Sequence, residues 1–121
     1  MKDDDVLAFL SATVKSLWAL ELLLLMRRER ARVWKMAALV AELRASTVVV
    51  QDALAGLIGA GLIAEDETGL FCYRPASETL DSFVAEAQAL YAAKPLAVIN
   101  AIAAAPNEKL RIFSDAFRLK D

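Results

Sequence analysis

The chain has 121 residues, of which 58% are hydrophobic and 7% aromatic, and its formal net charge is −2. This length fits one domain with its own core, and the aliphatic excess favours helices and leaves apolar surface for a partner. The sequence has no histidine and one cysteine, which excludes the commonest general base, a Cys/His zinc site and an internal disulfide. We therefore expect neither an enzyme nor a bound metal or cofactor.

The first predicted element is one long helix that runs from about Val6 to Met26. Three aspartates at positions 3–5 suit the positive end of its dipole. Residues 17–26 are apolar on almost every side of this helix, so we expect it to lie between its own domain and a partner. The apolar run contains Glu21 and is too short to cross a bilayer, and the acidic N-terminus does not resemble a signal peptide. We therefore expect a cytoplasmic protein without membrane contact.

A basic segment ends this helix, where cations suit the helix dipole. Residues 27–35 carry a net charge of +4, whereas residues 36–75 carry −3. A second helix is expected over about 35–44. A third is expected over about 48–60, capped by Ser46 or Thr47 and ended by a glycine at position 61. The third helix is expected to bury Val50, Leu54, Leu57 and Ile58.

A short hairpin is predicted next. Residues 62–64 form its first strand, residues 65–69 its acidic turn, and residues 70–74 the returning strand. The fold class is therefore mainly α with a small β-hairpin. The order of helices and hairpin matches a winged helix-turn-helix with extra helices at both ends.

The segment Val50-xxx-Leu54-xx-Leu57-xxx-Gly61-Leu62-Ile63 carries a specific resemblance. It resembles the junction between recognition helix and wing in MarR-type bacterial transcriptional regulators. The resemblance covers about residues 35–75. It implies a winged helix-turn-helix that binds double-stranded DNA, and flanking helices that build a homodimer.

The tail is predicted to form three further helices. One starts near Ser77, and Pro95 and Pro106 separate the next two, over about 96–104 and 107–119. We assign residues 1–75 to a winged-helix domain and residues 76–121 to a packing extension of the same domain. The side chains expected at a dimer interface, from the first helix and the tail, are Leu10, Trp18, Leu22, Leu25, Tyr91, Ile99, Phe113 and Phe117.

The resemblance also assigns a DNA-binding face. The residues nearest base edges would be Thr47, Val48, Gln51 and Asp52. Glutamine can read adenine, and valine can touch a thymine methyl group. The residues that would touch phosphates are Arg30, Arg32, Lys35, Arg44, Ser46 and Arg74.

The charges of this face favour a second interpretation. Asp52 repels phosphate, no Arg or Lys lies between Arg44 and Arg74, and the hairpin turn reads Glu65-Asp66-Glu67. Phosphate contacts supply most non-specific affinity for DNA. The alternative is therefore a winged helix that binds another protein and not DNA. The basic segment can equally be a solvated helix end, and Trp18 can be an ordinary interface anchor.

Overall fold

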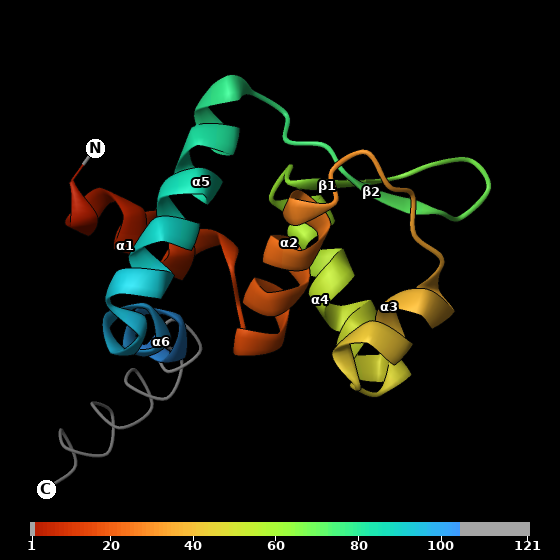
Figure 1. Ribbon diagram of the computed structural model, residues 1–121, viewed down its shortest axis with the longest axis horizontal. Coiled ribbons are helices and arrows are strands. Elements are labelled where there is room, and N and C mark those ends of the chain that lie inside the picture. The colour runs from red at the N-terminus through yellow and green to blue at the C-terminus, as the bar shows by residue number, and fades with distance from the viewer. Residues whose placement is uncertain (1, 105–121) are drawn as a thin grey trace, which may run out of the picture.

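The computed structural model describes residues 2–104. Its elements in chain order are α1 (Asp3–Thr13), α2 (Leu17–Arg28), α3 (Met36–Leu43), α4 (Thr47–Gly59), β1 (Ile63–Glu65), β2 (Phe71–Tyr73), α5 (Glu78–Ala93) and α6 (Pro95–Ala104) (Figure 1). The predicted class, mainly α with a small hairpin, is confirmed. The helix predicted over 107–119, with Phe113 and Phe117, lies outside the described residues.

The prediction of one long first helix is wrong, because the chain bends by 108° between α1 and α2. Val14 ends α1 in an extended conformation, which suits its β-branched side chain. Ser16 is also extended and caps α2, its hydroxyl accepting a hydrogen bond from the Ala19 N–H at 3.0 Å. The sequence pattern hid this break because both helices bury apolar residues at a common spacing.

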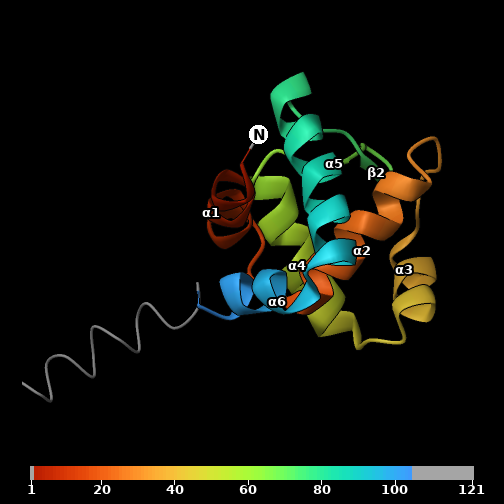
Figure 2. The same ribbon diagram turned by 60° about the vertical axis from the view of Figure 1, so that its left-hand side comes forward.

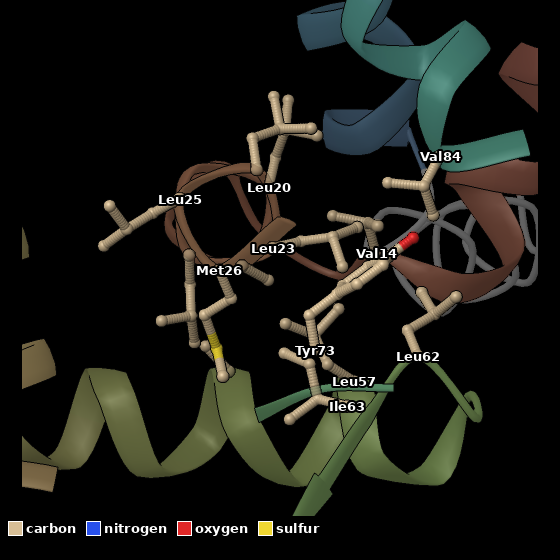
Figure 3. Packing of buried hydrophobic residues seen from close by; sticks show 14 of the residues in the cluster. Val14, Leu20, Leu23, Leu25, Met26, Leu57, Leu62, Ile63, Tyr73 and Val84 are labelled. Atoms are coloured by element: carbon tan, nitrogen blue, oxygen red, sulfur yellow. The ribbon is translucent and has the colours of Figure 1, made fainter. Parts of the chain in front are cut away.

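Helix α2 forms the centre of the core. Figure 3 shows it nearly end-on, with Leu20, Leu25 and Met26 leaving it in different directions. A helix that is apolar all round needs cover on every side, and here the chain itself supplies it. Leu10 and Leu22 are 0% exposed and Leu25 is 7% exposed. Their predicted role at a dimer interface is therefore corrected, since the chain's own core already buries them.

Helices α3 and α4 pack against each other and are joined by a short turn. Arg44 ends α3 in the left-handed conformation, with φ of 54°. The Ser46 hydroxyl caps α4 by accepting a hydrogen bond from the Val49 N–H at 3.2 Å. Ser46 is one of the two residues predicted to cap this helix. Gly61, with φ of 78°, follows the end of α4. The prediction that Ile58 is buried is wrong, because its side chain is 37% exposed at the edge of the buried side of the helix.

The hairpin is antiparallel, with Ile63 opposite Tyr73 at its open end and Glu65 opposite Phe71 next to the turn. Trp34 extends this small sheet, since it exchanges backbone hydrogen bonds with Phe71 at 2.7 and 2.8 Å. An extended segment before α3 therefore lies beside β2. Nothing in the sequence pattern predicted this third extended segment.

Helices α5 and α6 close the fold on the side of α1, away from α3 (Figure 1, Figure 2). The rings of Phe9 and Phe83 stack with centroids 4.9 Å apart. The Ser11 hydroxyl donates to the Ala101 carbonyl at 2.9 Å. Residues of α5 and α6 belong to the same core cluster as those of α2 and α4, so residues 2–75 and the described part of the tail share one core.

Candidate nucleic-acid interface

The predicted base-contact residues share one exposed face at the start of α4. Thr47, Val48, Gln51 and Asp52 are all exposed, because α4 buries its opposite side against α2 and α3. Val48 is the most prominent, with 64% of its surface exposed. The face therefore combines a hydroxyl, an amide, one carboxylate and an apolar side chain.

The two ends of α3 carry the cations nearest this face in the chain. Lys35 precedes the first residue of α3, and Arg44 follows its last residue. Both side chains are exposed, and neither forms an ion pair with another described residue. The eight residues of α3 lie between them, so the Lys35 and Arg44 backbones are roughly 13 Å apart along its axis. They are free to bind an anion.

Arg30 and Arg32, also predicted to touch phosphate, have partners within the chain. Arg32 lies over the Trp34 ring at 3.5 Å and pairs with Glu29 at 3.4 Å. Arg30 pairs with Asp81 at 3.3 Å and lies 5.3 Å from the centre of the Tyr73 ring. Both side chains remain about half exposed, so each keeps donors that face solvent.

A polar network that the sequence did not reveal joins α2, β2 and α5. We call it the Asp81 cluster, and it consists of Arg27, Arg30, Tyr73, Asp81 and Gln88. The Tyr73 hydroxyl donates to Asp81 at 2.6 Å, and the Arg27 guanidinium donates to Gln88 at 3.0 Å. The bond from Tyr73 and the charge of Arg30 lower the pKa of the Asp81 carboxyl. Burial, and then the bond to Asp81, raises the pKa of Tyr73.

Ser46 and Arg74, the other two residues predicted to touch phosphate, differ from Lys35 and Arg44 in their surroundings. The Ser46 hydroxyl already caps α4, so it is engaged in the fold. Arg74 follows β2 at the open end of the hairpin, at the far end from the turn.

In the turn of the hairpin, the Asp66 carboxylate accepts hydrogen bonds from the Thr68 N–H and hydroxyl and from the Leu70 N–H, at 2.8, 2.6 and 3.0 Å. The bond from the Thr68 hydroxyl is the main cause of a lowered pKa of Asp66.

A hollow of about 300 Å³ opens where α1 meets α2, on the side of α4. We call it the elbow groove. Trp18 forms part of its wall with 43% of its surface exposed, and Leu17 beside it is 42% exposed. Sequence reasoning missed the groove because the break between α1 and α2 creates it. Its lining is mostly apolar and comprises Thr13, Lys15, Ser16, Trp18, Ala19, Val49, Asp52, Ala53, Gly56 and Leu57.

Comparisons with protein-family models, curated proteins and solved structures gave no match to this chain.

The remaining predicted dimer contacts lie apart from α4. Tyr91 is partly buried and donates to Glu21 at 3.0 Å, and Ile99 on α6 is partly buried. The homodimer stays a prediction.

Within residues 2–104, no three Asp, Glu or Cys side chains are grouped closely enough to hold a metal ion. Among the same residues, no single helix is both long and apolar enough to span a membrane.

Proposed function

We propose that this chain is a winged-helix regulator that binds double-stranded DNA through α4. The supporting observation is the arrangement around α4: a short turn joins α3 to α4, the first turn of α4 is exposed, and a hairpin extended by Trp34 follows. Winged helices have this order of elements and lay the second helix of the pair in the major groove. Function by fold is analogy, so the proposal depends on the chemistry of the face.

The side chains divide into two groups by what they can contact. Thr47 and Gln51 can hydrogen-bond base edges, and Val48 can touch a thymine methyl group. Lys35 and Arg44 carry charge that the fold does not use, so phosphates can neutralise it. Asp52 and the acidic hairpin turn repel the phosphate backbone of DNA. We therefore expect a modest, strongly salt-dependent affinity for any duplex from the phosphate contacts, and a preference among sequences from the α4 face.

Fluorescence anisotropy with a short, dye-labelled random-sequence duplex tests this proposal. The affinity should fall steeply between low and moderate salt. Replacing both Lys35 and Arg44 by Gln should lower the salt slope by about 2 and weaken binding at least tenfold at low salt, on the order expected for two phosphate contacts. This variant keeps the side-chain length while removing two positive charges.

The matched control removes the same charge elsewhere. Helices α1 and α6 lie on the side of the molecule away from α3 (Figure 1). Lys2 and Lys94 immediately precede their first residues, and Lys94 pairs with Asp3. The variant Lys2→Gln/Lys94→Gln should bind as the wild type does. Equal weakening by both variants, or no binding by the wild type at low salt, would overturn the proposal.

One observation favours a second function, the binding of another protein. Val48 is 64% exposed, and no Arg or Lys occurs from position 45 to position 73. An apolar centre with an acidic rim is typical of a protein-binding face. In that case Val48→Asp should abolish capture of a protein partner, while Lys35→Gln/Arg44→Gln should leave capture unchanged. DNA binding predicts the opposite for the second variant, because it depends on those two charges.

A further inference from the structure

The elbow groove is an apolar surface that the described residues leave uncovered. Leu57 and Ala53 form part of its lining, and Trp18 stands at its wall with 43% of its surface exposed. Gly56 faces the open space of the groove, because a Cβ atom built there meets no other atom within 4 Å. Exposed tryptophan beside an apolar hollow is a costly arrangement in water. Some other group should therefore cover it.

The chain itself passes close to the groove as it leaves the described structure. Asp3 pairs with Lys94 at 2.9 Å, and the Ser11 hydroxyl bonds the Ala101 carbonyl at 2.9 Å. The last turn of α6 therefore lies against the last turn of α1. Thr13, two residues after Ser11, is part of the groove lining. Whatever follows Ala104 thus starts beside the groove.

The sequence after Ala104 contains apolar side chains suited to the elbow groove. Residues 107–119 are predicted to form an amphipathic helix whose apolar stripe is Leu110, Phe113 and Phe117. Cations flank this stripe at positions 109, 111 and 118. In the groove, Asp52 is exposed and has no ion-pair partner among residues 2–104. The lining also contains the cation Lys15, so the segment and the groove are complementary in apolar character, and Asp52 offers one site for a cation.

We propose that residues 107–119 dock into the elbow groove of the same chain. Leu110, Phe113 and Phe117 pack on Trp18 and the floor of the groove, and a flanking cation lies near Asp52. The link from Ala104 to Asn107 is short, and a few residues at about 3.5 Å each span the width of a helix. The docked segment shields Trp18 from solvent.

Acrylamide quenching of intrinsic fluorescence in the full chain tests the shielding. Trp34 is 1% exposed, so a change in quenching reports Trp18. Replacing both Phe113 and Phe117 by Ser should raise quenching about twofold, as expected when an indole ring passes from buried to half exposed. The matched control is Ile112→Ser/Leu119→Ser, two apolar residues on the opposite side of the predicted helix, and it should leave quenching unchanged. Equal quenching of wild type and the Phe113/Phe117 variant would overturn the proposal.

Disulfide trapping then identifies the occupant. With Cys72 replaced by Ser, Gly56→Cys and Ser114→Cys should form an intramolecular disulfide on mild oxidation, because bonding needs Cα atoms within about 7 Å. Gly59→Cys with Ser114→Cys is the control. A built Cβ at Gly59 also meets nothing within 4 Å, but this residue does not line the groove. The control should form the disulfide much more slowly.

Two outcomes of the trapping experiment would overturn the proposal. A disulfide that joins two chains, with a yield that rises with protein concentration, would show that a second copy fills the groove. Equal trapping at Gly56 and Gly59 would show random encounters only. Neither readout involves DNA, so failure of the docking proposal and failure of the DNA-binding proposal are separable.

Discussion

The Asp81 cluster and the ends of α3 use similar cations in opposite ways. Arg27 and Arg30 contact partners from α5, and Arg30 also lies near the Tyr73 ring of β2. Lys35 and Arg44 are exposed and form no ion pair with another described residue. In the sequence, Arg27, Arg30 and Lys35 belong to one basic segment. The fold divides that segment into cations that stabilise the structure and a cation that remains available for a ligand.

A local count of charges is therefore a poor guide to an anion site. Ion pairs exposed to water contribute little, whereas partly buried charges with several hydrogen bonds contribute more. The Arg27 side chain is 22% exposed: its Nε lies 3.6 Å from Asp81 without a hydrogen bond, and its guanidinium donates to Gln88. The fold therefore engages most of this side chain. If the two regions differ as proposed, substitutions in the Asp81 cluster should lower stability, and substitutions at the ends of α3 should change only binding.

The largest effect is expected at Tyr73, which is 5% exposed and anchors the cluster. Tyr73→Ala removes both the packed ring and the hydroxyl, and should lower the free energy of unfolding by about 3 kcal/mol. Tyr73→Phe removes only the bond to Asp81 and should cost about 1 kcal/mol. Urea denaturation measures both values. Equal losses from the two variants would contradict the assignment, since they would leave no contribution from the packed ring.

A smaller loss is expected for Asp81→Asn. The side chain is 29% exposed, so we discount its charge-assisted bonds for solvent screening and expect about 1 kcal/mol near neutral pH. The folded state lowers the pKa of Asp81. Its contribution is therefore complete above the ordinary aspartate pKa of about 4 and is lost as the pH falls through the lower folded value.

Denaturation of wild type and Asp81→Asn across acidic pH checks the sign of this effect. The difference in unfolding free energy should shrink below about pH 4. Glu86→Gln is the control, because Glu86 is exposed on the same helix and has no ion pair among the described residues. Its stability should follow that of the wild type. A difference for Asp81→Asn that grows towards low pH would contradict the lowered pKa.

The smallest effect on stability is expected at the ends of α3. Lys35→Gln/Arg44→Gln should change the unfolding free energy by less than about 0.5 kcal/mol, as is usual for exposed side chains without partners. The same variant should lose most of its DNA affinity. A large loss of stability would show that these cations support the fold, and the distinction between the two regions would then fail.

Much of the fold could be predicted from local signals. The serines at positions 46 and 77 cap α4 and α5, and Gly61 follows the end of α4, because caps and left-handed positions depend on a few neighbouring residues. The resemblance assigned Thr47, Val48 and Gln51 to the outward face of the third helix, and all three are exposed. Burial of Ile58 was mispredicted, since an apolar residue can lie at the edge of a helix's buried side.

Local sequence patterns therefore suffice for the kind and order of the elements from α3 to the hairpin. Which charges are paired and which are free depends on contacts distant in the chain, because Asp81 meets Arg27 and Arg30 from more than fifty positions away. The tertiary structure also decided that α1 and α2 are separate helices and that a groove opens where they meet. Periodicity reports which side of a helix is apolar, but it does not report the direction in which the next helix leaves.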